Sequence, residues 1–312
     1  MTKKSSQRDA IGDALIELGG EFEKLVVLSP DVGKSTRALK YKALYPDRYF
    51  CTGISEANTI GLASGLAAVG YTALVAGYAM FVAGKTWEQI RNSICYPKMN
   101  VKIIATHGGI NVGPDGVTHQ AIEDIALMRV IPNMTVLVPC DAEEVLPLIR
   151  LALSIDGPVY LRTERQDLPH ISVTEQNYTI GGASILREGS DVTIIAVGGM
   201  VNKSLNAADI IAQEGINARV INMYSIKPLD EESVINAAKD TGCVVTVEDH
   251  NMYGGLTGAV SEVIVQNNPI PMESVAVEDT FAESGTAAML HKKYHLTEKD
   301  IISAVKRGMA RK

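Results

Sequence analysis

Residues 53–81 read GISEANTIGLASGLAAVGYTALVAGYAMF, and residues 87–129 read WEQIRNSICYPKMNVKIIATHGGINVGPDGVTHQAIEDIALMR. Helical and strand-like patterns alternate through this stretch. We predict helices over 57–69, 87–95 and 120–129, and strands over 71–78 and 101–107. Such alternation is typical of a parallel sheet with helices on both faces, so the stretch indicates an α/β fold.

The alternation extends in both directions from this stretch. Apolar residues at helical spacing predict a helix over 7–18 that ends at Gly19-Gly20. The run LVVLS at 25–29 is typical of a strand buried on both faces. A further strand is predicted for TVLVPC at 135–140, which completes one α/β domain.

A second series of strands and helices begins after Tyr178. The stretch 162–182 separates the two series, because it is polar, contains Pro169 and shows no sustained periodicity. Strands are predicted over 191–199, 217–224, 242–249 and 271–279, and helices over 201–214 and 231–239, after a Gly-rich turn near 254, and from 297. The sequence therefore predicts a first domain at 1–172, a linker at 173–187 and a smaller α/β domain at 188–312.

Composition excludes several classes of function. The chain has 312 residues and a net charge of -7, and it has no internal cluster of Lys and Arg, so nothing predicts binding to nucleic acid or to an anionic membrane. No apolar run approaches the roughly 20 residues of a membrane span. The four cysteines are scattered without metal-binding spacing, which is typical of free thiols in a reducing compartment. We expect a cytoplasmic protein.

Several residues of the central stretch have a structural and a chemical interpretation. Glu56 begins the small-residue helix, where the helix dipole favours a carboxylate whatever its function. His107 ends a predicted strand at the edge where open α/β sheets bind ligands, and Asp115 and His119 lie on the next turn. Two histidines and an aspartate on successive turns are a candidate functional cluster.

Other candidates have weaker signals. The aromatic residues at the end of the predicted strand 71–78, Tyr78 and Phe81, and Trp87 behind them, have the default interpretation of core residues. Gly254-Gly255 precedes a predicted helix and could bind a phosphate, although close helix packing explains the pair equally well.

Several motifs in order carry a resemblance to a known family. They are ISEANTIGLASGLA at 54–67, THGGINVGPDGVTHQAIEDIALMRVIPNM at 106–134 with PCDAEE behind it, VEDHNMYGGLTGAV at 247–260 and FAESGTAAMLHKKYHL at 281–296. In this order they resemble the C-terminal half of transketolase, in the form found as a separate subunit of a split enzyme. The resemblance covers essentially the whole chain. It implies a parallel-sheet pyrimidine-binding domain for thiamine diphosphate, followed by a smaller transketolase C-terminal domain.

The resemblance also implies roles for individual residues. Glu56 matches the glutamate that hydrogen-bonds N1′ of the cofactor's aminopyrimidine, Phe81 matches the ring that stacks on it, and Tyr78 lines the same pocket. The implied substrate contacts are made by His107 and His119, which also manage protons, by Asp115, which binds a sugar hydroxyl, and by Arg165 and Ser35, which hold a sugar phosphate.

The sequence departs from the family pattern near the substrate. Gly108 stands where many transketolases have aspartate, and Pro114 stands where an acidic residue is common. Lys3 or Lys4 lies near the place of a usual phosphate-binding arginine. No GDG followed by a distant Asn occurs in the chain, so no metal ligand is assigned here. The diphosphate and its Mg²⁺ are expected on a partner N-terminal subunit, in an α2β2 assembly.

Three functions remain open from the sequence. The first is the C-terminal subunit of a two-chain transketolase, which moves a two-carbon ketol unit from a ketose phosphate to an aldose. The second is a related thiamine enzyme, a deoxyxylulose-phosphate synthase relative or the β-subunit of an α-ketoacid dehydrogenase. The third is a non-catalytic scaffold subunit, which would have no need for Glu56 together with both histidines.

Overall fold

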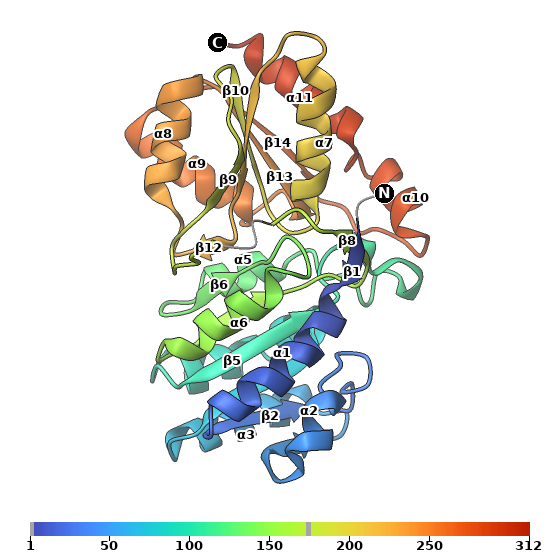
Figure 1. Ribbon diagram of the computed structural model, residues 1–312, viewed down its shortest axis with the longest axis vertical. Coiled ribbons are helices and arrows are strands. Elements are labelled where there is room, and N and C mark those ends of the chain that lie inside the picture. Colours follow the sequence, from blue (N-terminus) through green and yellow to red (C-terminus); the bar gives the residue numbers. More distant parts are fainter. Residues whose placement is uncertain (1–2, 173–175) are drawn as a thin grey trace.

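The computed structural model describes residues 3–172 and 176–312, which form two α/β domains stacked along the long axis of the molecule (Figure 1). Each domain contains a largely parallel sheet with helices on both faces, which confirms the predicted fold class. Residues 173–175 of the predicted linker lie outside the described residues. In the part of the chain that the structure describes, no helix has the length and apolar character that crossing a membrane requires.

The first sheet has seven strands in the order β12-β6-β7-β5-β4-β2-β3. Its parallel strands are β2 (Leu25–Ser29), β3 (Tyr49–Cys51), β4 (Thr72–Tyr78), β5 (Val101–Thr106), β6 (Thr135–Leu137) and β7 (Val159–Arg162). The edge strand β12 (Ser225–Lys227) comes from the second half of the chain and pairs antiparallel with β6. The division of the chain at 172 therefore stays a prediction, because β12 crosses it.

Alternate residues of the first sheet pack against different helices. Along β4, Leu74 and Ala76 belong to the core shared with α1 (Gln7–Glu21) and α6 (Val145–Ser154), while Val75 faces α3 (Glu56–Ala68) on the other side. The remaining helices of this domain are α2 (Leu39–Leu44), α4 (Trp87–Gln89) and α5 (Asp124–Arg129). Both faces of β4 are buried, and its successive side chains alternate between the two helical layers, which fixes the register of the strand.

The prediction that Gly19-Gly20 ends the first helix is wrong, since α1 continues to Glu21. A β-carbon at Gly19 would lie 2.5 Å from the Tyr45 ring and 2.7 Å from the Tyr41 ring. The glycine thus allows α2 and its following turn to pack closely on α1, and close packing stabilises a helix that local propensity alone would end.

Two predicted helices differ in form from the expectation. The predicted helix 87–95 divides into α4 and a π-helical turn, Ile90–Cys95, and a second π-helical turn, Met80–Lys85, precedes it. The predicted helix 120–129 begins only at Asp124, because Ala121 is engaged in a bridge with Gly108. Both differences lie beside the candidate site, where π-helical turns are common.

The second sheet has five strands in the order β14-β13-β10-β11-β9. Its strands are β9 (Ser184–Arg187), β10 (Val192–Ala196), β11 (Ala218–Asn222), β13 (Val244–Asn251) and β14 (Met272–Val277). Helices α7 (Met200–Ala212) and α11 (Glu298–Met309) cover one face, and α8 (Glu231–Thr241) and α9 (Leu256–Asn267) cover the other (Figure 1). A short helix, α10 (Ala287–Lys293), was not predicted from the sequence.

The end of the predicted linker is a strand. β9 occupies the last four residues of the predicted segment 173–187 and pairs antiparallel with the edge of β11. A short edge strand depends on backbone pairing more than on an apolar side-chain pattern, which explains why its sequence signal was missed. At the N-terminus, β1 (Lys4–Ser6) pairs antiparallel with β8 (Asp167–Pro169), so the start of the chain lies beside the end of the first domain.

Candidate active site

Two of the predicted site residues, Tyr78 and His107, lie where the central strands of the first sheet end. Tyr78 is the last residue of β4, and it pairs in register with Thr106, the last residue of β5. His107 follows directly. Since the carboxyl ends of parallel strands meet at one edge of the sheet, this is the place where α/β proteins bind ligands.

Glu56 presents a buried carboxylate at the first position of α3. Its Oε2 accepts from Lys85 Nζ at 2.8 Å, and its side chain is only 7% exposed. No side-chain cap bond is made at this helix start, since the Ser55 hydroxyl donates to Thr52 O at 2.8 Å. Within the described residues, Lys85 is the hydrogen-bond partner of the carboxylate, so a capping role accounts for the position of Glu56 but not for its contacts.

Four of the predicted residues form one cluster of rings. The Tyr78 and His107 ring centroids are 4.1 Å apart, and the Phe81 and His119 rings meet edge to face at 5.1 Å. Tyr78 and Phe81 are 6.3 Å apart, as are Tyr78 and His119. Trp87 does not join this cluster, because its indole donates to Leu127 O at 2.9 Å and packs against the core.

His107 is held neutral in an unusual backbone conformation. Its φ is +65°, and it is 2% exposed. Burial, with the positive charges of Arg8 and Arg165 and the neighbouring His119, lowers the pKa of His107 to about 3. Nδ1 lies 2.8 Å from Thr106 Oγ1, and that hydroxyl reaches Gly77 O at 3.3 Å. If the hydroxyl donates to Gly77, then Nδ1 carries the proton and Nε2 is free to accept one.

The burial of neutral His107 predicts acid sensitivity. Its pKa is about 3 in the folded chain against 6.5 for an ordinary histidine, so its contribution to stability is complete above about pH 6.5 and is lost as pH falls toward 3. His107→Asn removes the titrating group, and asparagine tolerates the positive φ. Between pH 6 and 4, the free energy of unfolding of the native chain should fall with each pH unit by up to about 1.4 kcal/mol more than that of the variant. Urea unfolding at several pH values measures this, and equal slopes would show that His107 is not buried neutral.

Asp115 and Arg165 are brought together on the substrate side. Arg165 Nη1 donates to Asp115 Oδ1 at 3.1 Å and to Val112 O at 2.6 Å. Asp115 ends the 3-10 turn Ile110–Asp115 that follows the THGG segment. Ser35 lies in the loop after β2, and no contact joins it to Arg165 within the described residues.

Arg8 is a site residue that sequence reasoning missed. A cavity of about 450 Å³ next to Arg165 is lined by Lys4, Arg8, Pro114, Arg165, Gln166 and Asp167. Burial and the positive charges of Arg37 and Arg165 lower the pKa of Arg8, and its buried Nε has no hydrogen-bond partner among the described residues. The sequence pointed to Lys3 or Lys4 near the place of a phosphate-binding arginine, whereas Arg8 is the second residue of α1. The cavity is suited to an anion.

Gly254-Gly255 does not form a phosphate site. A β-carbon at Gly255 would lie 2.1 Å from Glu248 Oε2. The Glu248 carboxylate accepts from Leu256 N and Thr257 N at 2.8 Å each and so occupies the start of α9. The close-packing interpretation of the glycine pair is confirmed.

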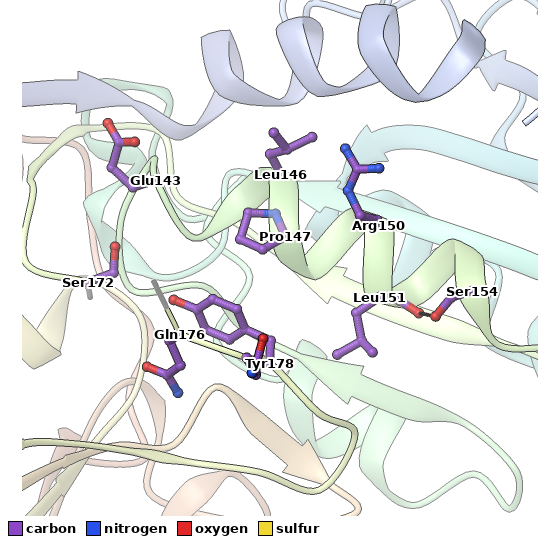
Figure 2. A pocket seen from close by; sticks show the side chains of 10 residues that line it. Glu143, Leu146, Pro147, Arg150, Leu151, Ser154, Ser172, Gln176 and Tyr178 are labelled. Atoms are coloured by element: carbon purple, nitrogen blue, oxygen red, sulfur yellow. Dashed lines mark hydrogen bonds between the residues drawn. The ribbon is translucent and has the colours of Figure 1, made fainter. Parts of the chain in front are cut away.

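A second hollow lies away from these residues, between α6 and the segment that contains Gln176 and Tyr178 (Figure 2). Its volume is about 540 Å³. The one guanidinium that lines it, that of Arg150, is ion-paired with Glu17 at 2.6 Å and with Glu21. None of the predicted site residues lines this hollow, so it is separate from the ring cluster.

The ring cluster contains the groups that a flat aminopyrimidine requires. Glu56 supplies a buried carboxyl group that in its protonated form can donate a hydrogen bond to a ring nitrogen, and Phe81 supplies a face on which a ring can stack. Lys85 links the two, since it pairs with Glu56 and belongs to the same π-helical turn as Phe81. The residues therefore fit thiamine diphosphate at its pyrimidine end. Among the described residues, no group of three or more His, Cys, Asp or Glu side chains could hold a metal ion.

Comparison with known proteins gives the same picture for the whole chain. Residues 3–170 match the family model "Transketolase, pyrimidine binding domain", and residues 181–301 match "Transketolase, C-terminal domain". The chain is 44% identical over 305 residues to a protein of Methanocaldococcus jannaschii described as a transketolase C-terminal section, and the match covers 97% of this chain and 96% of that one.

Two further relatives have nearly the same length. The chain is 38% identical to the 6-deoxy-6-sulfo-D-fructose transketolase subunit of a Clostridium species, over 98% of this chain and 95% of that one. A solved structure described as "Split gene transketolase, inactive beta4 tetramer" superimposes with a TM-score of 0.91 at 44% identity, covering 99% of this chain and 100% of the other. These relatives are described as subunits or sections of transketolases.

Proposed function

The chain belongs to the transketolase family, and from that premise we propose that it is the C-terminal subunit of a two-chain transketolase. It transfers a two-carbon ketol unit from a ketose phosphate to an aldose with thiamine diphosphate. The observation that carries this proposal is that Lys85, which pairs with the buried Glu56 carboxylate, belongs to the same turn as Phe81 of the ring cluster formed with Tyr78, His107 and His119. A scaffold subunit would not need that combination.

The cofactor, when bound, supplies the nucleophilic carbon and the electron sink of the reaction. The residues of this chain bind and activate it. Phe81 stacks on the aminopyrimidine, and Tyr78 closes the pocket from the end of β4. Glu56 holds its carboxyl against the ring nitrogen N1′, which favours the imino tautomer. For this Glu56 must exchange its ion pair with Lys85, whose flexible side chain is 57% exposed.

The two histidines have different surroundings and so different tasks. His107 is buried and neutral, and its Nε2 can accept a hydrogen bond from a sugar hydroxyl without competing for a proton at neutral pH. His119 lies against the Phe81 ring, beside the exposed Thr118 hydroxyl to which its Nδ1 bonds at 2.9 Å. We assign proton transfer at the sugar to His119 and substrate positioning to His107, with Asp115 binding a further hydroxyl.

A partner chain completes the site in this proposal. The N-terminal subunit carries the GDG motif and holds the diphosphate with its Mg²⁺. Along α3 the exposed residues Gly61 and Gly65, one turn apart, form a face without side chains, and outside the helix's own backbone no atom of the described residues lies within 4 Å of a β-carbon built on either glycine. Such a face permits close approach of a second chain, and we place the contact between two copies of this chain there, in an α2β2 assembly. The β4 tetramer of the split-gene relative supports self-association.

The basic cavity defines the outer end of the substrate. Arg8, Arg165 and Lys4 line it together with the carboxylate of Asp167, so basic side chains outnumber acidic ones where an anionic group on a sugar would bind. One relative is named for a sulfonated sugar, so the anion is a variable feature among the relatives. For this chain we propose phosphorylated sugars of the pentose phosphate type. All four cysteines are free, which supports a cytoplasmic location.

Arg165→Ala tests whether Arg165 binds the phosphate group of the sugar. A charge-assisted bond to phosphate contributes on the order of 1.5–3 kcal/mol, so KM for phosphorylated donors should rise by about 10- to 100-fold in the two-chain enzyme. KM for unphosphorylated donors should stay nearly constant. Arg150→Ala, which removes an arginine paired only with Glu17 and Glu21 outside the site, is the matched control and should change neither value.

Equal losses for both kinds of donor in Arg165→Ala would contradict the assignment. They would mean that Arg165 supports the turn through Asp115 and Val112 and does not bind the phosphate.

A further inference from the structure

The turn that carries Asp115 is held at its start by the second domain. Asp249, 2% exposed near the end of β13, accepts from the backbone N–H of Ile110 at 2.9 Å and of Asn111 at 3.3 Å. These two residues begin the turn Ile110–Asp115, which starts three residues after His107. The carboxylate of Asp249, in the second domain, therefore binds the backbone of the first domain between His107 and Asp115.

Glycine permits this contact. Gly109 has a φ of +79°, and a β-carbon there would lie 2.3 Å from Asp249 Oδ2. At Gly108 a β-carbon would lie 2.4 Å from Nε of Arg162, whose Nη2 donates to Asp249 O at 2.8 Å. The backbone of the THGG segment therefore packs directly against Asp249 and Arg162. A side chain at Gly108 or Gly109 would clash with these residues.

A second carboxylate, that of Glu164 in the first domain, accepts a hydrogen bond from the backbone of the second domain. Glu164, 3% exposed after β7, accepts from Gly199 N at 2.6 Å and from the Asn111 side-chain amide. Gly199 precedes α7 at the carboxyl end of β10, and the order of the second sheet reverses between β10 and β13. Open α/β sheets bind their ligands at that reversal. In this chain the Glu164 side chain of the first domain occupies that place, where a ligand of the second sheet would bind.

The orientation of Asp249 is fixed from its other side. His291 Nε2 lies 3.4 Å from Asp249 Oδ2, and Lys203 Nζ lies 2.6 Å from His291 Nδ1. Burial by itself would raise the pKa of Asp249, but the hydrogen bond and charge of His291, with the charge of Arg162, bring it below the ordinary value. The acceptor therefore remains ionised when it binds the turn.

We propose that Asp249 and Glu164 are positioning residues, through which the second domain fixes the turn Ile110–Asp115 and so sets the affinity of the site for its sugar. Neither residue touches the reacting atoms; both act through the backbone or side chain of Asn111 and its neighbours. The proposal rests on the function proposed above, because it concerns the substrate side of the same site. It gives the C-terminal domain a task in substrate binding.

The first variant is Asp249→Asn, which keeps the shape of the side chain but places an amide donor against backbone donors. KM for the sugar donor should rise by about 10-fold, since two hydrogen bonds to a charged acceptor are weakened. The dissociation constant for thiamine diphosphate should stay within about twofold, because Glu56, Tyr78 and Phe81 make no contact with Asp249 among the described residues. Hydrogen exchange of the full chain should accelerate by about 10-fold or more at the amides of Ile110 and Asn111.

Glu248→Gln is the matched control. Glu248 is the neighbouring residue of β13, is fully buried and also accepts two backbone N–H groups, but its donors, Leu256 and Thr257, belong to the second domain itself. This variant should lose thermal stability without changing KM or the exchange of Ile110 and Asn111. An equal rise of KM in both variants, or native KM and native exchange in Asp249→Asn, would overturn the proposal.

A substitute variant and a readout that does not depend on activity cover the two ways in which this experiment could fail. If Asp249→Asn does not accumulate as folded protein, Glu164→Gln is measured in its place with the same expected results and the same control, since it removes the charge that binds Gly199 and Asn111. If the native two-chain enzyme has no ketol transfer at all, the proposed function fails. The exchange of Ile110 and Asn111 in the variants then decides by itself whether the second domain holds the turn.

Discussion

Glu56→Ala is expected to lower kcat of the two-chain enzyme by at least about 100-fold, the usual scale for a positioned proton-transfer group. The carboxylate is buried at the first position of α3, and Lys85 Nζ at 2.8 Å is its hydrogen-bond partner within the described residues. A buried carboxylate whose one partner is a mobile lysine is available to a ligand. Removing it takes away the group that favours the reactive tautomer of the cofactor.

The competing explanation is that Glu56 only favours the start of a helix. Glu298 provides the control, because it also occupies the first position of a helix, α11, at a site remote from the ring cluster. Glu298→Ala should cost some stability and leave kcat unchanged. Circular dichroism and thermal unfolding establish that Glu56→Ala is folded, and excess cofactor should restore part of its binding. A near-native kcat for folded Glu56→Ala would return Glu56 to a helix-start role.

Most of the central strands of both domains were predictable because their signal is local, but β7 (Val159–Arg162), a buried parallel strand between β5 and β6, was not predicted. The run LVVLS coincides with β2, and the predicted strand 101–107 differs from β5 by one residue. Central parallel strands are buried on both faces and therefore appear in sequence as unbroken apolar runs. Edge strands such as β9 and β12 lack that pattern, since their positions depend on which backbone they pair with.

Part of the site was also predictable. Tyr78 and His107 end neighbouring strands, so the strand pattern alone places them at one edge of the sheet, and the structure brings their rings within 4.1 Å. The assigned roles of Glu56, His119 and Asp115 came from the family resemblance and stay predictions. No periodicity distinguishes a carboxylate that binds a cofactor from one that begins a helix.

The residues missed by the sequence share one property. The roles of Arg8, Lys85 and Asp249 depend on partners that lie 29 to 157 residues away in the chain. Lys85, the partner of Glu56, ends the π-helical turn Met80–Lys85. This turn departs from the 3.6-residue period of an α-helix, so the hydrophobic periodicity of the sequence does not predict it. Long-range pairing of this kind is set by tertiary packing, which one sequence does not display.

The central claim is that this chain is one half of a thiamine enzyme. On this account the chain supplies the pyrimidine end of the site, with Glu56 and Phe81, and the partner supplies the diphosphate and its metal. Each half alone should therefore bind the cofactor weakly and show no turnover. The split-gene relative with 44% identity is described as inactive in its β4 form, which agrees with this expectation.

The most direct measurement mixes the purified chain with an N-terminal subunit that carries GDG, in the presence of thiamine diphosphate and Mg²⁺, and follows ketol transfer as the ratio of the two chains is varied. The account predicts no transfer from either chain alone and activity that rises to a plateau at a one-to-one ratio, with the mass of an α2β2 complex. Substantial ketol transfer by the rigorously purified chain alone, or an active complex with the mass of a single heterodimer, would contradict it.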